Sequence, residues 1–364
     1  MNAPPGASGE CRFHTEPATW IRDAQGRRLR TIDFHAHTIS PAVEGLVADR
    51  PQKKAEMEIR LRTMGQASVE YNASVMLPQA ATPLSDLSVR LGDMDRMGVD
   101  MQVVSPLPTQ YYYWAEYDLA RQIVDRQNEH IAAICSRHPD RLVGLGTLAL
   151  QHPELAVAQL DHAVKNLGLR GFELSTAVND RELSHATLEP VWAKAEELGC
   201  VAFIHPMGCS LGERLQPAYL SNSVGQPVET AVALSHLICG AVLDRHPGLK
   251  VCAAHGGGYL PTYIGRADHA YHARPDARTT AHAPSHYLRR IFFDSLVYSP
   301  AGLRKLIDQV GAEQVVVGTD YPFDMGHFDI HALIRATADL TPEQHAAILG
   351  GNAARLLACS HHEL

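Results

Sequence analysis

The chain has 364 residues, which is long enough for one large hydrophobic core or two modest ones. With 45% hydrophobic and 20% charged residues it has the composition of an ordinary globular protein, and its net charge of -8 excludes the basic footprint of a nucleic-acid-binding domain. No run of 18 apolar residues occurs, so the sequence predicts no membrane-spanning segment.

Both ends of the chain are predicted to be tails. Residues 1–10 are rich in Pro, Gly, Ala and Ser and lack the charged-then-apolar order of a signal peptide, so we expect 1–30 to be a tail and leading segment. A second tail is expected at 359–364. The seven Cys are odd in number and scattered without C-x-x-C spacing, which favours reduced thiols in a cytoplasmic protein.

Eight runs of β-branched and apolar residues are predicted to be buried strands. They lie at 31–35, 101–105, 142–148, 171–175, 201–205, 250–255, 290–295 and 314–320. Segments with helical periodicity separate them, among them 117–138, 154–166, 188–198 and 301–310. This alternation predicts an α/β fold over residues 31–358, a (β/α)₈ TIM barrel, with a doubly wound open sheet as the alternative. The barrel is favoured because polar residues fall at the carboxyl ends of the strands, where barrels carry their sites.

The connection between the first two strands, residues 38–100, is longer than an ordinary strand-to-helix link. Within it we predict a charged amphipathic helix at 51–65, a loop over the Ala-, Pro- and Ser-rich stretch 71–85, and a helix at 86–97. Because this insertion follows a strand's carboxyl end, it is expected to cover the barrel mouth as a lid and a substrate wall.

Four side chains at strand ends have the pattern of a metal site. His35 and His37 are two residues apart on the first strand, so both imidazoles share a face. His205 ends the fifth strand and Asp320 ends the eighth. A single histidine at a strand end is commonly a structural residue, but their recurrence at three strand ends favours a shared ion. Three nitrogens and one oxygen suit Zn²⁺, or Mn²⁺ if more oxygen ligands join, and Zn²⁺ is favoured.

The fourth strand bears on the number of metal ions. Barrels with two bridged metals carry a Lys or a Glu there, and this strand has Glu173 but no Lys. Glu173 could bridge two metals, contact the substrate or belong to a buried ion pair. The missing Lys favours a single divalent ion.

The combined motifs resemble the amidohydrolase superfamily and, within it, the metal-dependent decarboxylases of the aminocarboxymuconate-semialdehyde decarboxylase family. The resemblance extends over residues 32–357. It is carried by the H-x-H strand, His205-Pro206, His255-Gly-Gly-Gly, Phe293-Asp294-Ser295, Gly318-Thr-Asp320-Tyr-Pro-Phe323, the stretches 226–230 and 235–240, and Gly265-Arg266. It implies that His35, His37, His205 and Asp320 hold the metal, that His255 is the acid/base residue beside it, and that Arg266 clamps a substrate carboxylate across the interface of a homodimer.

One departure from that family concerns the substrate. The family has a second carboxylate-binding Arg in the insertion, but residues 80–88 contain no Arg at the corresponding place, and Arg60, Arg62 and Arg90 are displaced from it. This argues against a substrate with two carboxylates in the family's arrangement.

These residues predict a non-oxidative decarboxylase that acts on an aromatic or muconate-type carboxylic acid. A metal ion stabilises negative charge as the C–C bond breaks, and Asp320 and His255 are candidates to protonate the carbon that loses CO₂. A hydrolase of a lactone, ester or amide, or a hydratase, would use the same ligands and is the alternative. A metal-binding module without turnover is a third reading, against which the presence of His255 argues.

Further residues allow two interpretations each. Asp294 either orients His255 or is a buried structural carboxylate, and Tyr113 and Trp114 either form an aromatic substrate wall or pack on helices. The apolar run 231–243 either lies at a subunit interface or packs on the barrel wall. Two other groups are poorer candidates: Asp324 and His327 could touch the substrate, and His269, His272, His282 and His286 could bind a second metal, although a solvated face is favoured.

Overall fold

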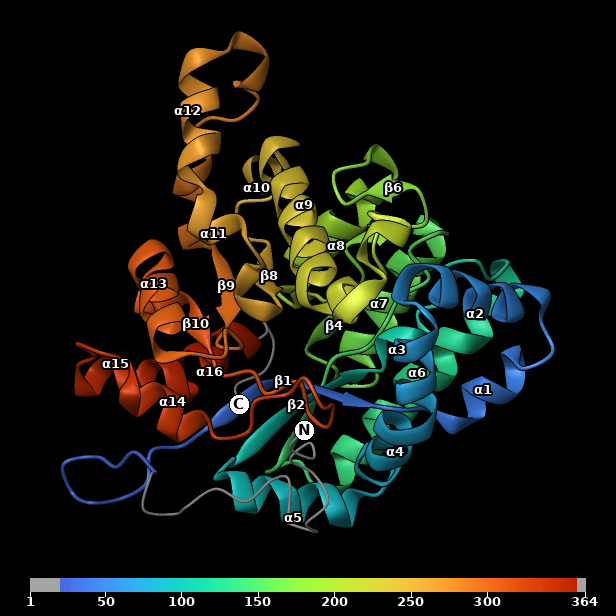
Figure 1. The fold of residues 1–364 in the computed structure, drawn as a ribbon, viewed down its shortest axis with the longest axis horizontal. Helices are drawn as coiled ribbons and strands as arrows, with labels where there is room; N and C mark the ends of the chain where they lie inside the picture. The colour runs from blue at the N-terminus through green and yellow to red at the C-terminus, as the bar shows by residue number, and fades with distance from the viewer. Residues whose placement is uncertain (1–19, 359–364) are drawn as a thin grey trace.

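The computed structural model describes residues 20–358 and contains a closed barrel of eight parallel strands. Helices surround these strands (Figure 1). The strands are β1 (Ile32–Thr38), β2 (Met101–Pro106), β3 (Leu142–Gly144), β4 (Gly171–Leu174), β7 (Val201–Ile204), β8 (Lys250–Ala253), β9 (Ile291–Asp294) and β10 (Val315–Val316). They form two parallel sheets, β1-β2-β3 and β10-β9-β8-β7-β4. Parallel bridges between Gly146 and Phe172 and between Asp33 and Val317 join the two sheets on both sides. The predicted TIM barrel is confirmed.

The joint between β1 and β10 matters most for the site, because both elements lead to predicted metal ligands. The N–H of Phe34 donates to the carbonyl of Val317 at 2.8 Å, and the N–H of Asp320 donates to the carbonyl of His35 at 2.9 Å. These backbone bonds hold the end of β10 beside the end of β1.

The barrel interior is filled by apolar side chains at its amino end. Phe34, Val103 and Phe203 pack there with Leu356 and Leu357 of α16 (Asn352–Leu357), which closes that end. The polar ends of the strands are therefore left at the carboxyl face, where a barrel carries its site.

Helices follow the strands and cover the barrel wall. They are α6 (Tyr117–Arg137), α7 (Pro153–Lys165), α8 (Glu189–Leu198), α9 (Gln226–Cys239), α10 (Val242–Arg245), α11 (Leu260–Tyr263), α12 (Gly265–Ala273), α13 (Pro300–Val310), α14 (Ile330–Ala336) and α15 (Pro342–Ala346), and a short hairpin of β5 (Ala177–Val178) and β6 (Arg181–Glu182) precedes α8. The four predicted helices agree with these bounds to within one residue.

The apolar run 231–243 forms most of α9 together with α10, and its apolar side chains face the barrel. Leu234, Leu237, Val242 and Leu243 are fully buried in the main core. The inward face of this run therefore packs on the barrel wall, as one of the two interpretations predicts. On its outer face, Val232 is 39% exposed.

The insertion is helical along almost its whole length. It contains α1 (Pro41–Val47), α2 (Pro51–Met64), α3 (Gln66–Tyr71), α4 (Leu77–Ser85) and α5 (Leu87–Met97), with a π-helical turn at Asn72–Met76. The helices predicted at 51–65 and 86–97 are confirmed, but the first is not amphipathic, because no residue of α2 is buried and Met57, Ile59 and Leu61 are exposed. The loop predicted at 71–85 is wrong. The α4 helix directly follows the π-helical turn with Pro78 as its second residue, Pro83 lies inside α4, and Ala80 and Leu84 are buried against Leu107.

A helical arm projects from the body of the molecule. It consists of α11 and α12, and α12 extends well beyond the other helices (Figure 1). No residue of α12 is buried in the single chain.

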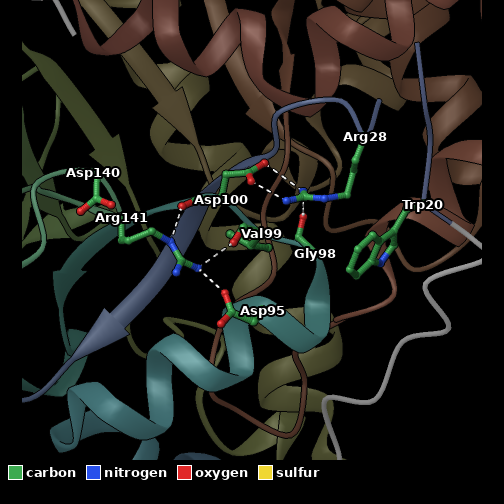
Figure 2. Close-up of a pocket in the computed structure, with 8 residues that line it drawn as sticks. All are labelled: Trp20, Arg28, Asp95, Gly98, Val99, Asp100, Asp140 and Arg141. Carbon is green, nitrogen blue, oxygen red and sulfur yellow. Dashed lines mark hydrogen bonds and ion pairs between the residues drawn. The ribbon is translucent and has the colours of Figure 1, made fainter. Parts of the chain in front are cut away.

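The leading segment packs at the amino ends of the strands. Within it, Ile21 is buried and Arg22 pairs with Arg28 in an antiparallel bridge. A polar cavity of about 400 Å³ lies here, and Figure 2 shows that both of its arginines, Arg28 and Arg141, pair with carboxylates. Arg28 binds both carboxylate oxygens of Asp100, and Arg141 lies 2.7 Å from Asp95. The cavity lies at the amino ends of the strands, on the face opposite the one where barrels carry their sites. Its paired charges therefore indicate a structural role for this cavity.

Some sequence predictions fall outside the described residues: those for the tails at 1–10 and 359–364 and for the two outermost Cys. Among residues 20–358, no helix is long and apolar enough to cross a membrane.

Candidate metal centre

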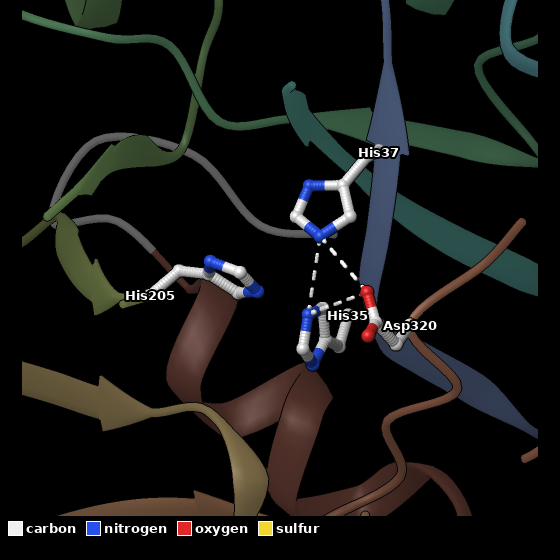
Figure 3. A group of neighbouring side chains, drawn as sticks. All are labelled: His35, His37, His205 and Asp320. Atoms are coloured by element: carbon white, nitrogen blue, oxygen red, sulfur yellow. Dashed lines mark hydrogen bonds and ion pairs between the residues drawn. The ribbon is translucent and has the colours of Figure 1, made fainter. Parts of the chain in front are cut away.

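The four predicted ligands converge at the carboxyl face of the barrel (Figure 3). One ligand atom from each of His35, His37, His205 and Asp320 lies within 4.8 Å of all the others, and all four residues are buried. The Nε2 atoms of His35 and His37 are 3.2 Å apart. Oδ1 of Asp320 lies 3.4 Å from Nε2 of His35 and 3.2 Å from Nε2 of His37.

A β-bulge in β1 aims both histidines inward. In the pairing of β1 with β2, Asp33 is opposite Gln102 but Ala36 is opposite Val104, so β1 carries one extra residue. The extra residue shifts the inside–outside alternation. Phe34 can therefore fill the barrel interior while His35 and His37, further along, turn their rings toward the same centre.

The arrangement fits a divalent cation. Three imidazoles and a carboxylate are the donor set that Zn²⁺ or Mn²⁺ takes. Both ring nitrogens of His205 are buried and have no hydrogen-bond partner among the described residues. A buried polar atom without a partner costs stability, and a cation bound by His205 would remove that cost.

The charges of the site are strongly coupled. Burial lowers the pKa of His35, but the negative charges of Asp320 and Asp294 outweigh it and raise this pKa to about 9. Burial raises the pKa of Asp320, but the imidazoles of His35, His255 and His37 outweigh it and hold this pKa well below its usual range. Burial and the neighbouring histidines lower the pKa of His205, so its imidazole is neutral and can donate a lone pair.

Two buried carboxylates stand behind the histidine ligands. Oδ2 of Asp294 lies 2.7 Å from Nδ1 of His35, which leaves Nε2 of that ring free to face the centre. Glu173 lies 3.6 Å from Nδ1 of His37 and accepts a 2.5 Å hydrogen bond from the hydroxyl of Tyr111. Asp294 is therefore placed to orient the His35 ring, whereas Nδ1 of His37 lies 3.2 Å from the carbonyl oxygen of Pro106.

The sequence allows two roles for Asp294, orientation of His255 or a buried structural carboxylate. It is fully buried, and its Oδ1 accepts from the backbone N–H groups of Gly256 and Leu296, at 2.8 and 3.1 Å. Its side chain thus orients His35 and holds only the backbone that follows His255.

His255 lies at the edge of the centre. Its Nε2 is 3.8 Å from Oδ2 of Asp320, and its ring centre is 5.2 Å from that of His205. It adopts a left-handed backbone conformation with φ 54°. The glycines that follow permit the sharp turn. A Cβ at Gly258 would lie 2.1 Å from the carbonyl oxygen of Pro227, so only glycine fits against α9.

A family model described as Amidohydrolase matches residues 32–358. The chain belongs to the amidohydrolase family. The 2-amino-3-carboxymuconate-6-semialdehyde decarboxylase of Dictyostelium discoideum is 36% identical over 274 residues, 75% of this chain and 76% of that protein. The enzyme of the same name from Caenorhabditis elegans is 30% identical over 384 aligned positions, 91% of this chain and 94% of that protein.

A solved structure has the same fold. The 5-carboxyvanillate decarboxylase of Novosphingobium aromaticivorans, which has bound manganese, superposes with a TM-score of 0.79 at 20% identity, over 90% of this chain and 97% of that chain. The superposition confirms the predicted fold. The family model and the two curated decarboxylases confirm the predicted family and make this amidohydrolase a carboxy-lyase.

The aromatic residues that follow β2 in this amidohydrolase lie in two different environments. Tyr111 and Tyr113 stack with ring centres 5.6 Å apart beside Glu173, and both are buried. Trp114 donates its indole N–H to Glu56 of α2 at 2.7 Å. Tyr113 thus belongs to the barrel mouth, whereas Trp114 anchors the insertion. Their contacts with substrate remain predictions.

The other residues predicted to bind substrate or metal lie outside the buried metal centre. Arg266 is exposed near the start of α12 and has no ion-pair partner among residues 20–358. Asp324 is exposed, and Nδ1 of His327 is buried without a hydrogen-bond partner among those residues. The His282 and His286 rings are 4.1 Å apart, but within the described residues the only group with metal-binding geometry is the His35 group.

Sequence reasoning missed a buried network behind the ligands. Both oxygens of Asp33 are used. Oδ1 accepts from the N–H groups of His35 and Thr319 at 3.1 and 3.0 Å, and Oδ2 accepts from the hydroxyl of Thr319 at 2.6 Å and the amide of Gln102 at 2.9 Å. Arg90 of α5 donates to Gln102 and to the carbonyl of His37. The available signal was a carboxylate inside an otherwise apolar strand, which requires buried donors.

Proposed function

We propose that this amidohydrolase is a non-oxidative decarboxylase of an aromatic or muconate-type carboxylic acid and uses one divalent metal ion. The observation that carries the proposal is the position of His255. An acid/base histidine lies within 3.8 Å of a carboxylate ligand, at the more open edge of a buried three-histidine, one-carboxylate centre.

His35, His37, His205 and Asp320 would hold the ion. When bound, it supplies positive charge against the negative charge that develops as the C–C bond breaks. We favour Zn²⁺ because three of the four donors are imidazole nitrogens, and the manganese of the carboxyvanillate enzyme keeps Mn²⁺ as the alternative.

The residues of the chain then handle the proton. When the C–C bond breaks, its electron pair stays on the substrate carbon and CO₂ leaves, so that carbon must take up one proton. His255 would deliver it, assisted by Asp320 beside it, while Asp294 would keep the His35 ring in place.

We also propose a homodimer in which Arg266 reaches the site of the second copy and binds a substrate carboxylate. The exposed α12 arm supports this, as do the large exposed side chains at its base. Tyr259 is 45% exposed and Tyr263 68% exposed. The test is complementation. Arg266→Ala and His255→Ala should each be inactive. When the two variants are mixed and exchange subunits at random, half of the dimers are heterodimers, and each heterodimer has one complete site. Activity should therefore return to about a quarter of wild type. Two variants that stay inactive when mixed as dimers would contradict it.

We further propose that the protein works in a reducing compartment, the cytoplasm. The Cys residues at 135, 209, 239 and 252 are free thiols. Alkylation of the native and the denatured protein without reductant checks this. It should find every thiol reactive after denaturation, and a protected pair would contradict the proposal.

The activity is tested with a panel of hydroxybenzoates and muconate-type acids on the zinc- and manganese-loaded enzyme. CO₂ release should be abolished by chelation, lost in His255→Ala and retained in the surface control His286→Ala. In D₂O, decarboxylation places one deuterium on the product carbon. A lactone, ester or amide cleaved without a new C–D bond would instead identify a hydrolase.

A further inference from the structure

A cleft of about 690 Å³ lies between the insertion and the loops that follow β7 and β10. Residues that line it include Met64, Tyr71, Asn72, Tyr219, Asp324 and Met325. Its size is that of small-molecule sites in proteins. All three segments belong to the carboxyl face of the barrel, where the metal centre lies.

One wall of the cleft belongs to the loop that carries the ligand Asp320. Asp324 and Met325 follow the ligand Asp320 by four and five residues, and the hydroxyl of Tyr298 donates to the carbonyl of Met325 at 2.9 Å. Burial raises the pKa of Tyr219 to about 12, and the negative charges of Asp324 and Asp320 add to the shift. The Tyr219 phenol therefore lies within electrostatic reach of both carboxylates.

The lining of the cleft carries negative charge and no positive charge. None of its lining residues is basic, and Asp324, its one charged side chain, is exposed and has no ion-pair partner among the described residues. Arg60 and Arg62 of α2 precede Met64 but do not belong to the lining. A second carboxylate in this cleft would find no cation and would be repelled by Asp324.

The remaining lining suits a neutral ring. Tyr71 and Tyr219 supply aromatic surface, and Met64 and Met325 supply adaptable apolar surface. The amide of Asn72 and the hydroxyl of Tyr219 add hydrogen-bonding groups to this lining.

We propose that this cleft holds the part of the substrate farthest from the metal and selects a neutral ring or chain with hydroxyl or amino groups over one with a second carboxylate. This inference rests on the proposed decarboxylase function. It distinguishes the chain from its carboxymuconate-semialdehyde relatives and narrows the substrates to acids with a single carboxylate.

The test compares salicylate with 4-hydroxyisophthalate, which has the same ring and a second carboxylate para to the hydroxyl. Dissociation constants are measured by calorimetry on the metal-loaded enzyme and kcat/KM by CO₂ release, in wild type and in Asp324→Lys. Asp140→Lys is the matched control, since it makes the same charge change at an exposed position beside the cavity of Figure 2, on the opposite face.

Wild type and Asp140→Lys should bind salicylate at least about tenfold more tightly than 4-hydroxyisophthalate. In Asp324→Lys, the ratio of the two dissociation constants should fall by about tenfold. Equal or tighter binding of the dicarboxylate to wild type, a ratio unchanged by Asp324→Lys, or binding of neither acid would overturn the inference. A different result would contradict the proposed function itself: no acid of the wider panel releases CO₂. Decarboxylation that favours dicarboxylates would refute the inference alone.

Discussion

Asp33 and Thr319 form two hydrogen bonds that tie β1 to the end of β10. The backbone N–H and the hydroxyl of Thr319 donate to the two oxygens of Asp33, at 3.0 and 2.6 Å. Thr319 directly precedes Asp320, and Asp33 also accepts the N–H of His35. One buried carboxylate thus sets the spacing between a histidine ligand and the carboxylate ligand.

Asp33→Asn should weaken metal binding by about tenfold or more, because an amide offers one acceptor where the N–H and hydroxyl donors require two. The dissociation constant for Zn²⁺ is measured by competition with a chromophoric chelator, independently of turnover. Asp23→Asn, which changes a partly exposed Asp of the leading segment, is the control. An unchanged constant in Asp33→Asn would show that the strand ends hold their spacing without it.

Asp294→Ala should lower metal affinity by about 10- to 100-fold, the usual effect of losing the residue that orients a histidine ligand. Asp294→Asn should fall between Asp294→Ala and wild type, because its carbonyl oxygen still accepts from Nδ1–H of His35. The same chelator competition measures both variants. If the two bind metal equally well, hydrogen bonding to His35 is not the role of Asp294.

Removal of the metal should destabilise the fold. An ion that binds only the folded state adds about 2.7 kcal/mol when its free concentration is 100 times its Kd, and in its absence the buried His205 nitrogens lose that partner. Thermal unfolding before and after chelation measures the effect, and readdition of Zn²⁺ should restore the Tm. His205→Ala should show a much smaller response to chelation than wild type.

Stability should depend on pH through His331, which is far from the chemistry. Burial lowers its pKa to about 4, and its Nδ1 accepts the N–H of Ile21 at 3.2 Å, a bond that needs the neutral ring. A lowered pKa in the folded state gives stability that is complete above the ordinary pKa of 6.5 and is lost as the pH falls from 6.5 toward 4, by up to about 3 kcal/mol.

The measurement for His331 is the free energy of unfolding by urea at pH 7.0, 6.0 and 5.0 in wild type and His331→Gln. Glutamine can accept and donate hydrogen bonds but does not titrate there, so the variant should lose less stability over this range. Parallel curves for the two proteins would contradict the assignment.

Much of the architecture could be predicted from local pattern. The eight strands and the helices at 117–138 and 301–310 follow from apolar runs and periodicity, because each segment buries one face whatever its neighbours are. Helix 71–85 could not be predicted in this way. Its Pro and Ser content indicates a loop, and only the packing of Ala80 and Leu84 against Leu107 makes it a helix.

The sequence by itself determined which residues could bind a metal, since His35, His37, His205 and Asp320 end strands that a barrel must bring together. Only the tertiary structure decided what stands behind them: Asp294 on His35, Asp33 between two strands, and an acidic cleft whose wall includes the loop of Asp320. The reason is physical. Strand order constrains where backbone ends meet, whereas a bulge, a hydrogen bond between residues far apart in sequence, or the charge of a cleft depends on side chains that meet only in the folded protein.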